Sequence, residues 1–405
     1  MYDNYELSSL LLNKKFSLER ADGILLYGKN NERILDFATG DSNCLGYNNR
    51  IIENQIIKQL NKGVFSQPNC FGNKQKNELK TKLCKLAGFS YTETSKECKV
   101  LFSNTSSEAN ENAIKIVRNR YNKLCERSYS EIICLKNSNH GNSIATISAS
   151  EKKNIHYAPL LRGFKFANIN DIDSIEKLIT EHTSAVMIEV VQTKNNITIC
   201  NEEFLTKLRE LCEYHKIGLI FDETKCGNGI TGNYFSYHRY KTKKDIKPDI
   251  ITAKNCLSGF NLSYCIVNDV FSHFVPNKLL YQDNCNILPY NISNTIINAI
   301  SSNAFLEQVR KKEKFFNNKL KSIHNKYEGI IKSVSNIGLI AEIKLREHIN
   351  GKKVHELLFY NGLFCRLSNN NIILYPPLIT TQNDIEKTCN IISNTLEQVS
   401  IIEGY

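Results

Sequence analysis

The chain has 405 residues, of which 41% are hydrophobic and 23% charged, as in ordinary globular proteins. This composition excludes fibrous and unfolded chains, and the length favours two interlocked domains or one large domain with a smaller one. The net charge of +11 comes from lysines spread along the chain without a basic block. We interpret it as a solvated surface and expect no binding of nucleic acid.

The location of the protein can be predicted from two further patterns. No apolar run reaches the roughly 18 to 20 residues that span a membrane, and the first residues lack the pattern of a signal peptide. The 14 cysteines stand singly, with no C-x-x-C pair, so we expect reduced and mostly buried thiols. We therefore predict a cytoplasmic protein with no membrane partner.

Short runs rich in β-branched residues alternate with helical patterns along the first two thirds of the chain. We expect five strands, at residues 98–102, 131–135, 185–191, 218–222 and 249–252. Residues 202–216 carry apolar side chains at helical spacing, and we expect a helix there. This alternation indicates βαβ units and an α/β fold with a largely parallel central sheet.

The pattern changes after about residue 289. We expect a long helix at 303–324, short strands near 330–343, 363–367 and 372–374, and a last helix at 384–399. This order is typical of a smaller α+β domain. We therefore predict a large domain at 41–290, a small C-terminal domain at 291–405, and an N-terminal segment, residues 1–40, that packs with the small domain.

Asp222 and Lys254 are the first residues that point to chemistry. Asp222 ends the apolar run GLIFD, and Lys254 ends the run PDIITAK 32 residues later. Because parallel strands end at the same edge of a sheet, the two side chains can meet around one ligand. Pyridoxal phosphate (PLP) needs such a pair, an amine to form an imine and a carboxylate to keep its ring nitrogen protonated. A surface salt bridge is the alternative for these two residues alone.

The segment SNTSSEANENAIKIVR, residues 103–118, turns from a strand into a helix that we expect to begin near Glu108. Backbone N–H groups and hydroxyls at a helix start can bind a phosphate, and Ser106 and Ser107 are the candidates. Ordinary N-capping by Ser106 or Ser107 is the alternative, and it is the simpler reading of this segment alone.

Motifs in the same order over nearly the whole chain resemble the class III aminotransferases of fold type I, particularly acetylornithine and ornithine aminotransferases. RILDFATGDSNCLGYNNR resembles the entrance segment of the family, SNTSSEANENAIKIVR its phosphate-binding turn, and NSNHGNSIATISAS its aromatic-H-G-R-T region. Further on, AVMIEVVQ, EEFLTKLRELCEYHKIGLIFDET, GNGITGNYF and KPDIITAKNCLSG follow the family, and YPPLITTQNDI resembles its closing segment. The resemblance implies the PLP-dependent transferase fold, with a large domain and a smaller C-terminal α+β domain.

The resemblance also implies roles for the matching residues. Lys254 would form the Schiff base with PLP and then move the proton during the transfer of the amino group. Asp222 would pair with the pyridinium nitrogen, and Ser106 and Ser107 would bind the phosphate.

Two further residues, Glu189 and Gln192, fall on the family's E-P-x-Q segment near the active site, and we name them as candidates for contact with the substrate. Because the family's active sites lie between subunits, the resemblance further implies a homodimer. The histidines show no metal-ligand spacing, and we expect no metal site.

Three residues depart from the family pattern where the cofactor binds. Asn139 stands where an aromatic residue normally stacks on the ring, so we expect weaker binding of PLP. Lys225 replaces a glutamine that approaches the ring hydroxyl, and its ammonium can stabilise a phenolate there. Asn284 aligns with a threonine that the neighbouring subunit contributes to the phosphate, and its amide can still donate a hydrogen bond.

The departures at the substrate side are larger. Ile373 stands where the family carries an arginine that clamps the substrate α-carboxylate. Arg366 lies on the preceding strand, but a turn near Asn369 predicts pairing of Arg366 with Ile372, on the face opposite residue 373. Lys194 replaces an acidic residue of ornithine-type enzymes, so the specificity for acetylornithine is not predicted by this segment.

Two functional hypotheses follow. The first is a working transaminase that moves an amino group from an acetylornithine-like or ornithine-like donor to a 2-oxo acid through Lys254 and PLP. The second is a catalytically impaired relative that acts as a PLP-binding protein or as the structural partner of an active subunit. The retained Lys254 and Asp222 favour the first, whereas Asn139, Ile373 and Lys194 favour the second.

Overall fold

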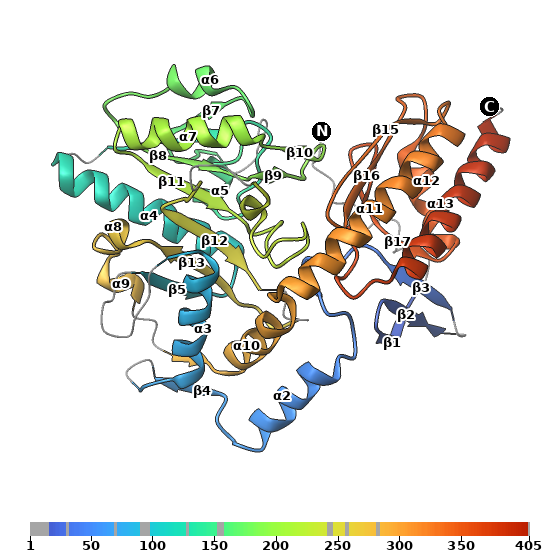
Figure 1. Ribbon diagram of the computed structural model, residues 1–405, viewed down its shortest axis with the longest axis horizontal. Helices are drawn as coiled ribbons and strands as arrows, with labels where there is room; N and C mark the ends of the chain where they lie inside the picture. The colour runs from blue at the N-terminus through green and yellow to red at the C-terminus, as the bar shows by residue number, and fades with distance from the viewer. Residues whose placement is uncertain are drawn as a thin grey trace.

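The computed structural model describes residues 16–29, 32–68, 71–89, 98–126, 129–151, 158–240, 246–255, 259–280 and 284–403. Figure 1 shows two parts of the molecule. The larger part, on the left, contains a central sheet and the helices that pack on it, and the smaller part, on the right, contains further strands and helices. The long helix α11 (Asn303–Lys326) runs from one part into the other. Within the described residues, no helix is both long and apolar enough to cross a membrane.

The central sheet has seven strands in the order β5-β13-β12-β11-β8-β6-β7. Its strands are β5 (Lys99–Ser103), β6 (Glu131–Leu135), β7 (Phe164–Ala167), β8 (Thr183–Ile188), β11 (Gly218–Asp222), β12 (Ile250–Lys254) and β13 (Ser263–Val267). Only β13 runs antiparallel to its neighbours, so the predicted α/β fold with a mainly parallel sheet is confirmed. The strands β7 and β13 were not among the five expected ones.

The apolar strands of this sheet are buried on both faces, which explains why they read as continuous apolar runs. Alternate residues of β11 point to opposite faces. Leu219 and Phe221 belong to the same apolar cluster as Phe204 of α7 (Glu202–Tyr214), whereas Ile220 joins Ile116 of α4 (Ser106–Cys125) in a second cluster. Helices therefore cover both faces of the sheet.

The expected helix at 202–216 is present as α7 and ends two residues earlier than expected. Its N-cap, Asn201, accepts a hydrogen bond from the backbone N–H of Phe204, and two glutamates occupy the first turn. Lys216, two residues after the helix, has a φ of 56°, a left-handed conformation that no longer continues the helix.

The smaller part contains an antiparallel sheet in the order β15-β16-β19-β18. Its strands are β15 (Ile331–Ile337), β16 (Ile340–Leu345), β18 (Arg366–Ser368) and β19 (Asn371–Leu374), and its helices are α11, α12 (Gly351–Tyr360) and α13 (Gln382–Glu403). The helices expected at 303–324 and 384–399 are thus present, and the run expected near 330–343 is a hairpin of two strands.

The two ends of the chain share a third sheet, in the order β1-β2-β3-β17. Its strands are β1 (Leu18–Asp22), β2 (Leu25–Gly28), β3 (Arg33–Asp36) and β17 (Leu363–Phe364). Backbone hydrogen bonds also join the N-terminal and C-terminal segments beyond this sheet. The N–H of Gly40 donates to the carbonyl of Tyr375 at 2.8 Å, and the N–H of Leu378 donates to the carbonyl of Cys44 at 2.8 Å. Residues 36–44 therefore lie beside the closing segment.

The remaining elements connect these sheets. They are α2 (Arg50–Leu60), β4 (Ser66–Pro68), α3 (Lys74–Leu86), α5 (Ile144–Ser148), α6 (Ile172–Glu176), β9 (Val191–Gln192), β10 (Thr198–Ile199), the 3₁₀ helix η2 (Ser236–Arg239), α8 (Asp269–Ser272), α9 (Asn277–Leu280), β14 (Asn284–Asn286) and α10 (Leu288–Ile300). α10 packs against α2 and α3 below the central sheet (Figure 1). The domain boundaries at residues 41 and 290 stay a prediction.

Candidate active site

A cavity of about 620 Å³ lies where the central sheet, the start of α4 and the hairpin of β18 and β19 meet. Five of the predicted cofactor-binding residues line it: Ser106, Ser107, Asn139, Lys225 and Lys254. The other lining residues are Asp41, His140, Gly141, Asn142, Thr193, Lys194, Asn195, Thr224, Arg366, Leu367, Ser368, Asn369, Ile373 and Tyr375.

Lys254 and Asp222 come from adjacent parallel strands. Asp222 ends β11 beside Thr252 of β12, and Lys254 lies two residues further along β12. The carboxyl ends of both strands open toward the cavity, as expected for ligand sites of α/β folds. The side chain of Lys254 lines the cavity, and that of Asp222 is fully buried next to it.

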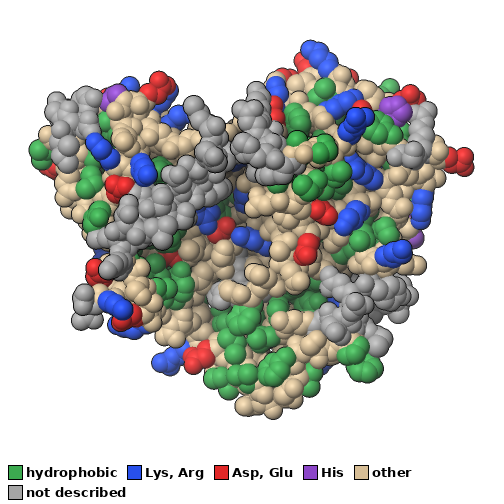
Figure 2. All heavy atoms as spheres, turned by 180° about the vertical axis from the view of Figure 1, so that it is seen from behind, with side chains coloured by type: hydrophobic (Ala, Val, Ile, Leu, Met, Phe, Trp, Pro, Cys, Tyr) green, Lys and Arg blue, Asp and Glu red, His purple; other side chains and the backbone are tan. Residues whose placement is uncertain are grey.

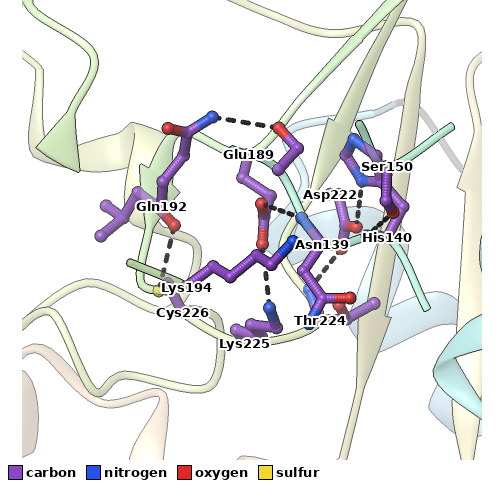
Figure 3. A network of polar contacts seen from close by, with 12 residues as sticks. Asn139, His140, Ser150, Glu189, Gln192, Lys194, Asp222, Thr224, Lys225 and Cys226 are labelled. Carbon is purple, nitrogen blue, oxygen red and sulfur yellow. Dashed lines mark hydrogen bonds and ion pairs between the residues drawn. The ribbon is translucent and has the colours of Figure 1, made fainter. Parts of the chain in front are cut away.

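Asp222 is held by a network of buried donors, of which Figure 3 shows His140 and Thr224. Its Oδ2 lies 2.7 Å from Nδ1 of His140 and accepts from Nδ2 of Asn110 at 2.8 Å. Its Oδ1 accepts from the backbone N–H of Thr224 at 2.9 Å. His140 is fixed in turn, since its backbone N–H donates to Oγ of Ser150 at 2.9 Å.

The charges of this pair follow from its surroundings. Burial would raise the pKa of Asp222, but the hydrogen bond and charge of His140 hold that pKa below its usual value. Burial would lower the pKa of His140, yet its hydrogen bond to Asp222 raises the pKa. The pair is therefore an imidazolium beside a carboxylate, and the carboxylate stays ionised at the base of the cavity.

The start of α4 differs from the capping that the sequence suggested. The N-cap is Thr105, whose Oγ1 accepts from the backbone N–H of Glu108 at 3.2 Å, while the Glu108 side chain accepts from the N–H of Thr105 at 3.0 Å. N-capping by Ser106 or Ser107 is thus wrong, because Thr105 caps the helix in a complete capping box, and the helix begins at Ser106, two residues before the start expected near Glu108. Ser106 and Ser107 occupy the first turn and face the cavity.

Gly141 allows the chain to come close to this helix start. It has a φ of +136°, and a Cβ there would lie 2.4 Å from Oγ of Ser107. The next residue, Asn142, donates its backbone N–H to the same Oγ at 3.0 Å. The turn after His140 therefore closes one end of the cavity around Ser107.

Glu189 joins two of the residues that depart from the family pattern. Its Oε2 accepts from the backbone N–H of Asn139 at 2.9 Å, and its Oε1 lies 3.5 Å from Nζ of Lys225 (Figure 3). Gln192 donates through Nε2 to the carbonyl of Lys136 at 2.9 Å and to Oγ of Ser138 at 3.0 Å. Glu189 and Gln192 are both buried behind the cavity lining, and their contact with the substrate stays a prediction.

Glu223 follows Asp222 but points away from the cavity. It accepts hydrogen bonds from the backbone N–H and Oγ of Ser236, at 2.9 and 2.6 Å, and from the N–H of Tyr237 at 3.2 Å. Burial raises the pKa of Glu223 to about 7 in spite of these donors. This acid therefore changes its charge near neutral pH.

Asp41 and Arg366 are site residues that the sequence analysis did not name as candidates. Asp41 accepts from Nζ of Lys254 at 3.0 Å through one carboxylate oxygen and from Nη2 of Arg366 at 2.5 Å through the other. Burial would raise the pKa of Asp41, but the charges of Arg366 and Lys254 lower it far below its usual value. Asp41 lies in the entrance segment, which is the only sequence signal that could have found it.

The pairing expected for Arg366 is wrong. β18 and β19 are joined by a turn at Asn369 and Asn370, so Arg366 lies opposite Ile373 and not opposite Ile372. Because residues directly opposite one another share a face of the sheet, Arg366 and Ile373 both face the cavity. The guanidinium also lies 4.9 Å from the ring centre of Tyr375, a cation–π contact.

The last predicted site residue, Asn284, begins β14, whose backbone pairs with Pro68 of β4. Its side chain lies outside what the structure describes. The contribution expected of it from a neighbouring subunit stays a prediction. No group of three or more His, Cys, Asp or Glu that could hold a metal occurs among the described residues.

Comparison with known proteins gives consistent findings. The family model described as Aminotransferase class-III matches residues 11–396. The acetylornithine aminotransferase of Agrobacterium fabrum is 31% identical to this chain, over 90% of each protein. That of Methanocaldococcus jannaschii is 28% identical, over 94% of each protein.

Solved structures show the same fold. The N-acetylornithine aminotransferase of Stenotrophomonas maltophilia superposes with a TM-score of 0.79 at 22% identity, covering 97% of this chain and 98% of the other. The ornithine aminotransferase of Toxoplasma gondii superposes with a TM-score of 0.86 at 19% identity, covering 96% and 92%. The fold expected from the resemblance, with its large and small α/β parts, is confirmed.

Proposed function

This chain belongs to the class-III aminotransferase family, and on that premise we propose an acetylornithine-like or ornithine-like compound as its amino donor and a 2-oxo acid as its acceptor. The family consists of PLP-dependent transaminases, so the cofactor is PLP and the substrates are amino acids and 2-oxo acids. The acetylornithine aminotransferases among its relatives support the choice of donor.

The single observation that carries the proposal is the arrangement around Lys254. One cavity presents a lysine amine, an ionised carboxylate at its base and a helix start with two serines. An imine-forming aldehyde, a ring nitrogen and a phosphate are the three groups of PLP that such residues can bind. The residues therefore fit the cofactor.

Each group of the chain has its own task in this proposal. Lys254 would hold the cofactor through Nζ and would carry the transferred proton at that atom. The carboxylate of Asp222 holds a proton on the ring nitrogen, and its partner His140 keeps the carboxylate ionised and oriented. Ser106, Ser107 and the first backbone N–H groups of α4 bind the phosphate. When bound, PLP supplies the electron-withdrawing ring that makes the proton transfer possible.

We propose that the two departures at the ring are tolerated. Asn139 is held by Glu189 through its backbone, so its side chain lies at the cavity in place of the stacking ring. Lys225 has its ammonium beside the carboxylate of Glu189, from where it can reach the ring hydroxyl. Glu189 in this reading orients both residues, and Gln192 supports the backbone behind them.

We further propose a homodimer, built on the apolar surface around α2. Figure 2 shows hydrophobic side chains gathered at the lower end of the molecule, where α2 and β4 lie. The exposed side chains there are Ile51, Ile57, Leu60, Val64, Phe65 and Phe71. Exposed apolar patches of this kind mark protein interfaces. A second copy would cover the patch and could bring Asn284 to the phosphate.

A cytoplasmic location also remains part of the proposal.

The test is an absorbance spectrum of the purified protein with PLP, for the wild type and for Lys254→Ala. We expect an absorbance band at roughly 410 to 430 nm in the wild type and no such band in Lys254→Ala. Addition of N-acetylornithine or ornithine should bleach the band of the wild type. Lys207→Ala is the matched control, because this lysine lies on the exposed surface of α7 and pairs with Glu203. A band that no amino acid bleaches would instead support the impaired relative that binds PLP, and the absence of any band would refute the transaminase and leave the structural partner of an active subunit.

A further inference from the structure

Arg366 faces the cavity from β18, the strand next to the one that carries the family's arginine position. Its side chain is 22% exposed, pairs with Asp41 at 2.5 Å and lies against the ring of Tyr375. Ile373, at the family's arginine position, lies directly opposite on β19. The positively charged side chain expected at position 373 of β19 is thus absent, and Arg366 on the neighbouring strand β18 faces the cavity instead.

We propose that Arg366 binds the carboxylate of the amino donor and of the 2-oxo acid, in place of the arginine that Ile373 replaces. The inference rests on the proposed transamination and names the residue that selects its substrates. The transfer of an amino group itself does not require this residue, so the two ideas can fail separately.

The strand register makes the exchange possible. Side chains of directly opposite residues leave the sheet on the same face, with Cβ atoms about 4.5 to 5.5 Å apart. An arginine side chain is longer than this separation, so the guanidinium of Arg366 can reach the space that an arginine at position 373 would use. The buried side chain of Ile373 contributes an apolar surface beside it, which strengthens a charge pair by excluding water.

The present contact of Arg366 shows which chemistry it accepts. Its partner Asp41 is a carboxylate, and a guanidinium has five N–H donors arranged to bind such groups in pairs. Arg366 can therefore hold Asp41 and a substrate carboxylate together. Asp41 also contacts Lys254 at 3.0 Å, so a single carboxylate joins Arg366 to the reacting amine.

The experiment compares two donors that differ only in the carboxylate, N-acetylornithine and N-acetylputrescine. We expect Arg366→Gln to raise the KM for N-acetylornithine about a hundredfold, because two charge-assisted hydrogen bonds are lost, and to leave N-acetylputrescine nearly unchanged. The swap Arg366→Ile with Ile373→Arg should restore most of the preference for the carboxylate. Arg346→Gln is the control, since Arg346 contacts the carbonyl of Glu328 outside the cavity.

A second measurement separates this inference from the proposed function. Glutarate, an unreactive dicarboxylate, is titrated into the protein with PLP bound, and the change in absorbance gives its Kd. We expect Arg366→Gln to weaken glutarate binding by tenfold or more and the swap to recover it. This readout holds even if no donor reacts.

Three outcomes would overturn the inference. The first is an equal loss with both donors, which would make Arg366 a structural link to Asp41. The second is wild-type affinity for glutarate in Arg366→Gln. The third is a swap variant that folds and binds PLP but does not recover the preference for the carboxylate.

If Arg366→Gln does not fold, Arg366→Lys replaces it. The lysine keeps the charge without the paired donors, and an intermediate loss of affinity is then expected.

Discussion

The two sides of the cavity are built in different ways. The base of the cavity, formed by Lys254, Asp222 and His140, comes from the ends of buried parallel strands and the turn that follows one of them. The rim of the cavity, formed by Asp41 and Arg366, comes from an N-terminal loop and a C-terminal hairpin. The base matches the family pattern residue by residue, whereas the rim carries the departure at position 373.

This difference separates the chemistry from the choice of substrate. In the proposed function the base binds PLP, the cofactor that every reaction of the family shares, and its residues are held by a sheet that is buried on both faces. The rim lies on a loop and on β18, the edge strand of the smaller sheet, outside the central sheet. A cation can therefore move from one strand of the hairpin to the other without disturbing the groups that hold the cofactor.

The strongest test of the comparison is Asp222→Asn at the base. We expect the transfer of the amino group to slow by about a hundredfold or more, because a neutral amide cannot hold the proton on the ring nitrogen. The substitution also leaves His140 without its carboxylate, which we expect to cost about 3 to 5 kcal/mol of stability. Single-turnover absorbance measurements, made well below the melting temperature, give the rate.

Asp269→Asn is the control for this test, because Asp269 is exposed in the first turn of α8. A wild-type rate in Asp222→Asn would show that the base does not act through this carboxylate.

Glu223, the residue after Asp222, tests whether a buried acid beside the base destabilises the fold when it ionises. Its pKa is raised by burial from 4.5 to about 7, so the folded protein keeps a proton that the unfolded chain releases above pH 4.5. The free energy of unfolding of the wild type, relative to that of Glu223→Gln, should therefore fall between about pH 4.5 and 7, by roughly 1 to 3 kcal/mol.

Urea unfolding of both proteins at pH 5, 6, 7 and 8 gives this difference, and the remaining titrating groups cancel in it. A difference that does not change with pH would mean that Glu223 is ionised throughout.

Asn139→Phe restores an aromatic ring at the cavity. We expect PLP to bind about three to ten times more tightly, since a stacked ring adds about 0.5 to 1.5 kcal/mol. Titration of the PLP-free protein by absorbance gives the Kd. Asn139→Leu is the control for apolar area without a ring, and an equal gain from Leu and Phe would argue against stacking.

Asp41→Asn has the smallest expected effect. Removing the carboxylate 3.0 Å from Nζ of Lys254 takes away a charge that stabilises the ammonium. Because attachment of PLP to Nζ breaks this ion pair, we expect the variant to bind PLP about two to five times more tightly in an absorbance titration at fixed pH. Asp22→Asn, an exposed change in β1, should leave the Kd unchanged, and weaker binding of PLP by Asp41→Asn would contradict the argument.

The base of the cavity was predictable because its residues end or follow apolar runs. Lys254 and Asp222 stand at the ends of β12 and β11, and the parallel order of the strands brings them together. The capping of α4 was not predictable from the serines alone, since Thr105, Ser106 and Ser107 are all good N-cap residues and only the position of Glu108 completes the box at Thr105.

The rim was harder to predict for a geometric reason. Whether Arg366 faces the cavity depends on the register of a hairpin, and a shift of one residue at the turn moves the side chain to the other face. A turn of two residues at Asn369 and Asn370 decides the register, and the run of asparagines permits neighbouring turns as well. Asp41 lies in the entrance segment, but its role follows from contacts with Lys254 and with Arg366, and Arg366 lies 325 residues away.

That separation has a consequence for the synthesis of the protein on the ribosome. Lys254 and Asp222 are translated well before the hairpin, so the strands that carry them can pair while the chain is still growing. Asp41 is among the first residues made and must wait for residue 366 among the last. A truncated chain that lacks the C-terminal hairpin would therefore present Lys254 beside an Asp41 without its arginine partner, and only release of the full chain completes the pocket that selects a substrate.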